Sequence, residues 1–440
     1  MKRKTKRARI LAVLLGLALL ACAGAAYAYA SAAVRPGEPP AVTFAGFTAA
    51  PARSTWSEPV LGGLLQKRLI EAAPEPQSDL GILRTGHLAL ETDPDIQALW
   101  TVWQGETQVF SGTPSEFGAF AFSQNGPCRA VLEVTLPPEQ DRSEGAFVYE
   151  FVFALDVRSR VLFSSDRALQ GDILAVYVNR GFETDAPVIE TELGRAVFLP
   201  LSPDESIAYV PVNYAQQPGK WDIDVHLGGK AYSQSVIVTA RTFGKQYMTI
   251  SKATADATMN NPEGPENWAT RIKVLWDTYD EEKRWTEVFL QPCQGRISTA
   301  FGLYRYTNDN PVPGRHSGID IAAAAGTPVA AANSGRVVRA EYVIYTGNTV
   351  VIEHGGGLKT YYFHMDSLDV KEGDLVQRGQ RIGKVGSTGY STGAHLHFEV
   401  KMGSSSLDPW ALFDGSSEIY YQGEWLSQEN PGAPEGSLPQ

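Results

Sequence analysis

The chain has 440 residues, too many for one ordinary hydrophobic core, so we expect two to four domains. The formal net charge is −11, but six cations lie within the first nine residues, and the remainder has 32 Lys and Arg against 49 Asp and Glu, a net charge near −17. Because a phosphate backbone needs a basic face, this acidic body argues against nucleic acid as a partner, whereas a basic tip on an acidic body is typical of a membrane-targeted protein.

A long apolar run follows the N-terminal cations. Residues 10–34 contain no charged side chain, which is enough to span a bilayer as a helix with the cations on the cytoplasmic side. Two alternatives stay open: cleavage of a signal peptide at triplets such as Ala26-Tyr27-Ala28, or lipidation at Cys22, where the sequence resembles a bacterial lipoprotein box. We predict an uncleaved membrane anchor over residues 1–34. All three alternatives place residues 35–440 outside the cytoplasm, in the cell envelope.

The next stretch is rich in Pro, Ala and Gly, and we predict a linker over residues 35–80. From residue 81 the pattern changes to short apolar segments separated by turn residues, a spacing typical of antiparallel β-sandwiches. It predicts a sandwich-like domain over residues 81–157 and a second small sandwich over residues 158–250. Neither stretch contains a residue pattern that indicates a catalytic site.

Residues 251–288 are charged, with apolar residues at helical spacing, and they predict a helical connector. Residues 289–413 return to short strands and are rich in glycine, which indicates many tight turns. The end of the chain is rich in Gly, Pro, Ser and acidic residues, and we predict a disordered tail over residues 414–440. These elements together predict a mainly β protein with a short helical connector and an N-terminal membrane helix.

The three cysteines are far apart in the sequence, at Cys22, Cys128 and Cys293. No Cys-x-x-Cys pair occurs, so a thiolate zinc site is not expected. We expect Cys128 and Cys293 to be buried free thiols, with a disulfide between them as the alternative.

Five of the seven histidines lie between residues 316 and 397. His316 and Asp320 are four residues apart, a separation that suits a shared metal. On a strand, His395 and His397 would point the same way, about 6.6–6.8 Å apart, so that one can bind a metal while the other stands beside it. His364 lies in a β-like run. Two His and one Asp would form a three-ligand zinc set with an open fourth position, which is typical of catalytic rather than structural zinc.

Several short motifs around these residues become specific in combination. They are RHSGIDIAA at residues 315–323, GTPV at 326–329, YFHM at 362–365, GSTG at 386–389 and STGAHLHFE at 391–399. Together they closely resemble the lysostaphin/LytM-type zinc endopeptidases of bacterial cell walls, over about residues 289–413.

The resemblance implies a role for each of five side chains. The metal ligands of that family match His316, Asp320 and His397, which implies one Zn²⁺ per chain. The family's two catalytic histidines match His364 and His395. Zinc would lower the pKa of a bound water and polarise the scissile carbonyl, and the two histidines would transfer protons and stabilise the tetrahedral intermediate. The sequence does not say which of the two is the base.

The implied substrate is the peptide part of peptidoglycan, cut at cross-links or in stem peptides. Residues 160–290 also resemble the Ig-like domain and connector that precede the peptidase domain in many Gram-positive members. The alternative function is a non-catalytic or docking envelope protein that regulates another cell-wall hydrolase. The sequence identifies no protein partner.

Two further residues near the clustered histidines are considered for a role at the site. His354 precedes a Gly-rich turn, and we predict that it is structural. Glu399 could share the face of His395 and His397 and support a metal ligand from behind, but we expect a solvated glutamate at the end of a strand.

Overall fold

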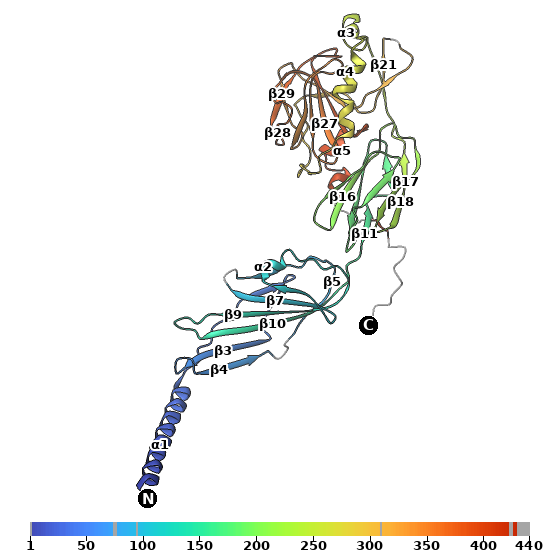
Figure 1. The fold of residues 1–440 in the computed structure, drawn as a ribbon. Helices are drawn as coiled ribbons and strands as arrows, with labels where there is room; N and C mark the ends of the chain where they lie inside the picture. The colour runs from blue at the N-terminus through green and yellow to red at the C-terminus, as the bar shows by residue number, and fades with distance from the viewer. Residues whose placement is uncertain (1, 74–76, 94–95, 309, 422–425, 429–440) are drawn as a thin grey trace. The chain divides into compact units, whose positions relative to one another are not determined.

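The computed structural model describes residues 2–73, 77–93, 96–308, 310–421 and 426–428. It divides into two compact units, Met1–Arg158 and Ser159–Gln440. Strands dominate both units (Figure 1), so the predicted mainly β fold class is confirmed.

The chain begins with helix α1 (Lys2–Ser31). Its segment Leu11–Ser31 has 21 residues and a mean hydropathy of 2.2, which is long and apolar enough to cross a membrane. A cleavable signal sequence near an N-terminus has the same properties. The helix therefore agrees with the predicted anchor by length and composition.

The rest of the first unit is built from two sheets around an aromatic core. A 3-stranded sheet has the order β2-β1-β6, and a 7-stranded sheet has the order β4-β3-β10-β9-β7-β8 with β5 parallel to β10. Phe44 lies 4.9 Å from Trp100 and 5.2 Å from Phe151, ring centre to ring centre. The elements are β1 (Val42–Phe44), β2 (Phe47–Ala49), β3 (Arg53–Val60), β4 (Leu65–Ala72), β5 (Ser78–Leu83), β6 (Leu90–Thr92), β7 (Gln97–Gln104), β8 (Thr107–Gly112), α2 (Pro114–Phe117), β9 (Gly126–Leu136) and β10 (Glu144–Leu155).

The linker predicted over residues 35–80 is wrong, because this stretch contains strands β1 to β4 and the start of β5. Val42, Phe44 and Trp56 are almost fully buried in the core of the unit. Val42 and Phe44 are spaced two apart in β1, but the buried apolar residues of β3, Trp56 and Val60, are four apart. The high content of Pro, Ala and Gly around them conceals the strand pattern.

The second unit begins with a two-sheet sandwich. A 5-stranded sheet has the order β15-β16-β13-β11-β32, and a 4-stranded sheet has the order β12-β18-β17-β14. A core of aliphatic side chains lies between them, with Val176, Val210, Val225 and Val236 fully buried. A sandwich was predicted here, and its Ig-like character stays a prediction. The strands are β11 (Arg160–Phe163), β12 (Arg167–Leu169), β13 (Ile173–Asn179), β14 (Val188–Thr191), β15 (Phe198–Pro200), β16 (Glu205–Pro211), β17 (Gly219–Leu227), β18 (Lys230–Thr239) and β32 (Leu426–Gln428).

Short helices connect the sandwich to the last part of the chain, where a helical connector was predicted. They are α3 (Lys252–Ala257), α4 (Gly264–Arg271) and the 3-10 helix η1 (Lys273–Asp277). Ile272 and Leu275 are buried in a cluster with Tyr361 and Phe363 of the following sheet. The connector is therefore packed against the sheet rather than suspended between domains.

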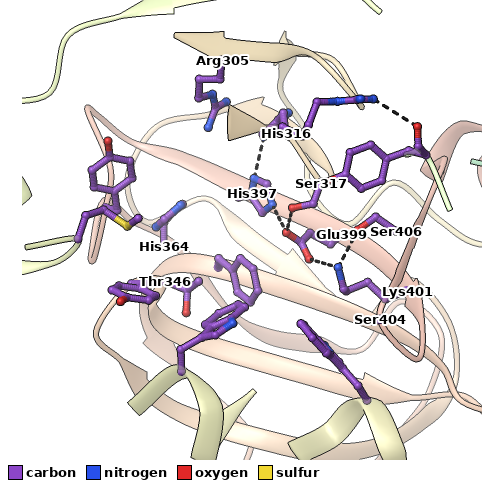
Figure 2. Close-up of a pocket in the computed structure, with 18 of the residues that line it drawn as sticks. Arg305, His316, Ser317, Thr346, His364, His397, Glu399, Lys401, Ser404 and Ser406 are labelled. Atoms are coloured by element: carbon purple, nitrogen blue, oxygen red, sulfur yellow. Dashed lines mark hydrogen bonds and ion pairs between the residues drawn. The ribbon is translucent and has the colours of Figure 1, made fainter. Parts of the chain in front are cut away.

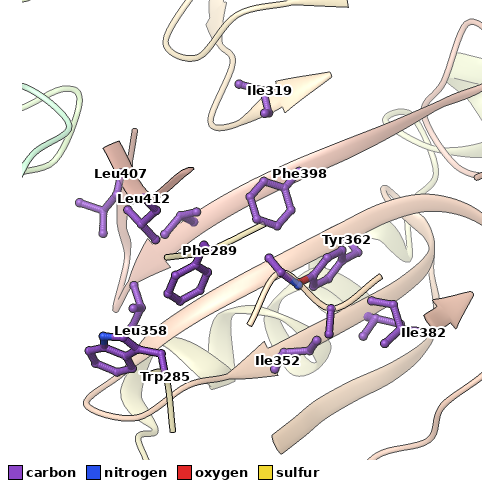
Figure 3. Packing of buried hydrophobic residues seen from close by; sticks show 14 of the residues in the cluster. Trp285, Phe289, Ile319, Ile352, Leu358, Tyr362, Ile382, Phe398, Leu407 and Leu412 are labelled. Carbon is purple, nitrogen blue, oxygen red and sulfur yellow. The ribbon is translucent and has the colours of Figure 1, made fainter. Parts of the chain in front are cut away.

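The last part of the chain is a 10-stranded sheet with a small 3-stranded sheet, β19-β21-β22, beside it. The main path of the large sheet is β20-β23-β30-β27-β26-β25-β28. Its core includes Phe289, Tyr362 and Phe398 (Figure 3). The elements are β19 (Lys245–Met248), β20 (Arg296–Thr299), β21 (Tyr304–Thr307), β22 (Gly314–Arg315), β23 (Ile319–Ala322), β24 (Pro328–Ala330), β25 (Gly335–Val343), β26 (Gly347–Glu353), β27 (Leu358–Leu368), β28 (Leu375–Val376), β29 (Arg381–Val385), β30 (His395–Met402), β31 (Ser405–Leu407) and α5 (Pro409–Phe413).

The sandwich and the large sheet share this core. Ile173, Leu199 and Tyr209 of the sandwich belong to the same buried cluster as Phe289 and Phe398. Such fully buried side chains each contribute roughly 1.5–3 kcal/mol of hydrophobic stabilisation. The two parts therefore form one packed unit.

The predicted disordered tail is only partly described. The 3-10 helix η2 (Glu418–Tyr420) packs Ile419 into the shared core, and β32 pairs with β11. Disorder is thus the wrong prediction for residues 418–420, where an apolar side chain reaches the core. Residues 429–440 lie outside the described residues.

Candidate metal centre

Three neighbouring strands bring the candidate site together. β30 lies between β23 and β27, with Asp320 and Phe363 both opposite His397. Because side chains alternate along a strand, His395 and His397 share one face of β30. His316 lies just before β23, and His364 follows Phe363 on β27. The register of the sheet thus places the five predicted side chains in one region.

Three ligand atoms form a small triangle. His316 Nε2 lies 2.9 Å from Asp320 Oδ1 and 2.9 Å from His397 Nδ1, and His397 Nδ1 lies 2.8 Å from Asp320 Oδ1. All three residues are buried and form a group that could hold a metal ion. It is the group that the sequence motifs predict.

In each of the two histidines of the triangle, the ring nitrogen that points away from it has a hydrogen-bond acceptor. His316 Nδ1 donates to the Ala300 carbonyl at 2.9 Å, and His397 Nε2 donates to Glu399 Oε1 at 2.9 Å. A neutral imidazole carries one N–H, so His316 Nε2 and His397 Nδ1 then carry lone pairs. Two nitrogen lone pairs and one carboxylate oxygen converge, as in zinc sites that keep an open fourth position. The residues fit a zinc ion.

The ionisation of the triangle follows from its burial and its contacts. Burial lowers the pKa of His316. Burial acts to raise the pKa of Asp320, but hydrogen bonds from His316 and His397 outweigh it and hold that pKa well below its usual value. Burial acts to lower the pKa of His397, but its bonds to Asp320 and Glu399 outweigh it and raise the pKa to about 9. In the absence of metal, this raised pKa places a proton on His397 Nδ1, in the position that a cation would take among the three atoms.

His364 and His395 stand beside the triangle. Their ring centres are 4.8 Å apart, and His395 Nε2 lies 3.7 Å from Asp320 Oδ1. His364 Nδ1 donates to the Thr388 carbonyl at 2.8 Å, and His395 Nδ1 donates to the Gly393 carbonyl at 2.8 Å. The Nε2 atom of each neutral ring is therefore free of a proton and able to accept one.

Both rings are neutral at pH 7. Burial, and then the nearby charges of His395 and His397, lower the pKa of His364 to about 3, and burial lowers the pKa of His395. His364 also has a φ of 63°, in the left-handed region that a non-glycine residue seldom adopts. Such strain is concentrated at functional sites, where the surrounding structure enforces it.

Glu399 corrects a prediction. It is buried rather than solvated, because β30 continues to Met402 and its face carries Glu399 and Lys401 beyond His397. Glu399 Oε1 accepts hydrogen bonds from His397 Nε2 and from the Ser317 hydroxyl, and Oε2 lies 3.8 Å from Lys401 Nζ. Burial acts to raise the pKa of Glu399, but Lys401 and the bonds from His397 and Ser317 lower it to about 2. Figure 2 shows Glu399 on the opposite side of His397 from His364.

Asp320 has a support of its own that the sequence did not indicate. Arg305 Nη2 donates to Asp320 Oδ2 at 2.9 Å, and Arg305 Nε donates to Gln246 Oε1 at 2.9 Å. One carboxylate oxygen is thereby held by arginine, and the other is turned toward the triangle. Arg305 and Gln246 lie 15 and 74 residues before Asp320, outside every motif, so no sequence signal marked them.

His354 lies apart from the metal group, as its predicted structural role requires. Its ring is fully buried, Nδ1 donates to the Ser334 carbonyl at 2.7 Å, and Nε2 lies 2.8 Å from Thr360 Oγ1. Both nitrogens are thus used within the scaffold. Cys128 and Cys293 are buried free thiols, as expected.

A cavity of about 430 Å³ opens beside the triangle (Figure 2). Its walls come from three parts of the second unit. Tyr214 belongs to the sandwich, and its amide donates to the Ser406 carbonyl at 3.2 Å. Trp268 and Trp276 belong to the connector. The lining residues are Asn213, Tyr214, Met259, Trp268, Trp276, Arg305, Arg315, His316, Ser317, Tyr345, Thr346, Phe363, His364, Tyr390, His397, Glu399, Lys401, Ser404 and Ser406.

Comparison with known proteins places this region in a family. Residues 314–409 match the model of peptidase family M23. Peptidoglycan DD-endopeptidase ShyB of Vibrio cholerae is 45% identical over 102 residues, 22% of this chain and 24% of that protein. Lysostaphin of Staphylococcus simulans is 44% identical over 95 residues, 21% of this chain and 19% of that protein. The chain thus spans about a quarter or less of the length of these relatives.

One solved structure is similar in sequence over part of the chain. The catalytic domain of lysostaphin from Staphylococcus simulans is 30% identical, covers 33% of this chain and 98% of that chain, and has a TM-score of 0.23. The sequence matches coincide with the strands that carry the triangle of ligand atoms. The chain therefore carries a domain of peptidase family M23, as its motifs predict.

Proposed function

We propose that this protein is a zinc-dependent endopeptidase that hydrolyses peptide cross-links or stem peptides of bacterial peptidoglycan. The observation that carries the proposal is the buried triangle of His316 Nε2, Asp320 Oδ1 and His397 Nδ1. The M23 relatives named as peptidoglycan DD-endopeptidases support the substrate class.

In this proposal His316, Asp320 and His397 would hold one Zn²⁺, which would supply Lewis-acid activation of a water and of the scissile carbonyl. Arg305 and Glu399 hold the ligands in orientation from behind. His364 and His395 present Nε2 atoms without a proton beside the triangle, where one would accept the proton of the attacking water. The ring protonated in this way would then donate to the oxygen that gains negative charge. Burial lowers the pKa of both rings, which keeps them neutral at pH 7.

The shape of the cavity supports a peptide substrate. Its walls combine aromatic rings, such as Tyr214, Trp268 and Trp276, with hydrogen-bonding groups such as Ser404 and Ser406. Aromatic rings that alternate with hydrogen-bonding and charged groups can contact both the backbone and the side chains of a peptide. Because Tyr214 belongs to the sandwich, we propose that the sandwich shapes the substrate groove rather than serving as a spacer alone.

The protein is proposed to act from the membrane. Helix α1 would anchor the chain, with its cations in the cytoplasm and both folded units on the outer side, where peptidoglycan lies. Attachment by a helix would restrict the enzyme to peptidoglycan within reach of the bilayer.

The decisive experiment incubates the full-length protein with purified sacculi and identifies the released muropeptides by mass spectrometry. We expect peptide-bond cleavage with zinc, none after removal of zinc by a chelator, and recovery on adding zinc back. The His316→Ala variant should neither bind zinc nor release muropeptides. Zinc-loaded protein that releases nothing, but captures another envelope protein in stoichiometric amount, would favour the docking alternative.

A further inference from the structure

The hairpin between β3 and β4 exposes leucines at its tip. Leu61 is 46% exposed, Leu64 is 84% exposed and Leu65 is 41% exposed, with two glycines between the first two. β4 is the edge strand of the 7-stranded sheet, so this hairpin is bordered by a second strand on one side only. Exposed apolar side chains gathered in this way are candidates for contact with a partner or a membrane.

The backbone of the tip is unusual as well. Leu61 has a φ of 55°, followed by Gly62 at 67° and Gly63 at 92°. Glycine adopts these angles freely, but a leucine in the left-handed region is strained, and Asn or Asp is the common choice there. A tip built only to be soluble would not need leucine at that position.

The same hairpin is tied to the end of helix α1. Lys67 of β4 donates through Nζ to the carbonyls of Ala30 at 3.2 Å and Ala32 at 2.6 Å. Its Nζ also lies 5.9 Å from the centre of the Tyr29 ring. The contacts fix β4 next to the C-terminal end of the apolar segment Leu11–Ser31.

This contact sets the level of the hairpin relative to a bilayer. A helix of 21 residues is about 32 Å long, close to the roughly 30 Å of a hydrocarbon core, so its outer boundary lies near Ser31. Tyr27 and Tyr29 are exposed at that end, where interfacial tyrosines are expected. With α1 across the bilayer as proposed, Lys67 would lie at the outer membrane–water boundary. Leu65 shares its face of β4, and Leu64 is about 10 Å away along the strand.

We propose that the hairpin tip, residues 61–65, inserts its leucines into the outer surface of the membrane that holds α1. The inference rests on the membrane anchoring proposed above, and the lipid bilayer is the occupant to which it commits. Leu61, Leu64 and Leu65 bury their side chains at the level of the lipid headgroups and upper acyl chains, while Lys67 remains at the boundary. The first unit is then held at the bilayer by two points, which fixes its orientation.

The test measures depth in the full-length protein reconstituted in phospholipid vesicles. A fluorophore is attached at Leu64→Cys in a Cys22→Ala background, where the remaining thiols, Cys128 and Cys293, are buried. Quenching by a lipid with a nitroxide near the headgroup is compared with quenching by aqueous iodide. Leu20→Cys, within α1, reports on the anchor. Glu106→Cys is the matched exposed control, in the turn between β7 and β8 at the opposite edge of the sheet.

We expect the label at Leu64→Cys to be quenched by the nitroxide lipid several-fold more than the label at Glu106→Cys, and by iodide several-fold less. Equal quenching at these two positions, with the label at Leu20→Cys in lipid, would overturn the hairpin proposal and leave the anchor intact. A label at Leu20→Cys that is open to iodide would overturn both. Fluorophore self-quenching at Leu64→Cys that rises with protein density and is indifferent to nitroxide lipid would indicate a second copy of the chain instead.

Discussion

Glu399 links the metal group to the rest of the sheet. It accepts from His397 and Ser317 and lies beside Lys401, which donates to Ser406 Oγ at 2.7 Å. A carboxylate behind a ligating histidine fixes the ring and raises its basicity, and loss of such a partner typically weakens metal binding 10- to 100-fold. Removing the negative charge of Glu399 is therefore expected to lower the affinity for zinc.

Glu399→Gln is expected to weaken zinc binding by about 10- to 100-fold, because the amide is a weaker acceptor for the His397 N–H. Affinity is measured by competition with a chromogenic chelator. Glu372→Gln, at a largely exposed glutamate, is the matched control and should bind zinc as the unmodified protein does. Unchanged zinc affinity in Glu399→Gln would show that Glu399 is only a packing residue.

His364→Ala separates proton transfer from metal binding. We expect this variant to bind zinc normally, since His364 lies outside the triangle, and to lose about 10²- to 10⁴-fold in kcat, the usual contribution of general acid–base catalysis. Metal content by atomic emission and muropeptide release are measured on the same sample. If the variant lost zinc as well as activity, His364 would have to be a metal ligand rather than a proton-transfer residue.

At the scale of elements, β26 and β27 hold a buried histidine whose ionisation is coupled to folding. Burial lowers the pKa of His354 to about 4, from an ordinary value near 6.5. The unfolded chain therefore binds more protons than the folded one between these two values. The contribution of His354 to the free energy of unfolding is therefore complete above about pH 6.5 and is lost as the pH falls toward 4.

The shift of His354 corresponds to about 3 kcal/mol at full extent. We expect urea unfolding to show a smaller loss of stability between pH 6.5 and pH 4.5 in His354→Gln than in the unmodified protein. His364 and His395 act in the same direction in both proteins, so the difference between the two isolates His354. Identical pH dependence in the two proteins would contradict a buried neutral His354.

At the scale of the whole molecule, the second unit is expected to behave as one cooperative body. Leu199 of the sandwich is fully buried in the shared core, and a side chain added at Gly356 would meet it at 3.0 Å. Arg241 adds polar links, to Asp172 at 2.9 Å and to Asp408, which caps α5. The sandwich thereby supports the sheet that carries the metal group.

Leu199→Ala should lower the free energy of unfolding by about 2–5 kcal/mol, the usual effect of removing a buried leucine. The exposed neighbour Leu201, changed to Ala, is the matched control and should have little effect. Unfolding is followed by tryptophan fluorescence and by zinc release. A sandwich that unfolds while zinc remains bound would show that the two parts are independent.

The sequence by itself determined the mainly β class, the apolar N-terminal helix, the resemblance of residues 289–413 to lysostaphin-type peptidases and the residues that form the triangle. These features depend on local spacing. The alternation of side chains along a strand, and the separation of four positions between His316 and Asp320, already determine which side chains can meet. The sequence does not indicate the strands within residues 35–80, because Pro, Ala and Gly outnumber their few apolar positions.

Only the tertiary structure decided what surrounds the triangle. Arg305 reaches Asp320, Tyr214 reaches the cavity, and Leu199 enters the core of the large sheet, and each of these contacts joins segments far apart in the chain. Glu399 is a buried partner of His397 because β27 pairs with its end of β30 and Ser317 and Lys401 contact its carboxylate. Such contacts depend on how sheets pack, and packing leaves no periodic signal in a single sequence.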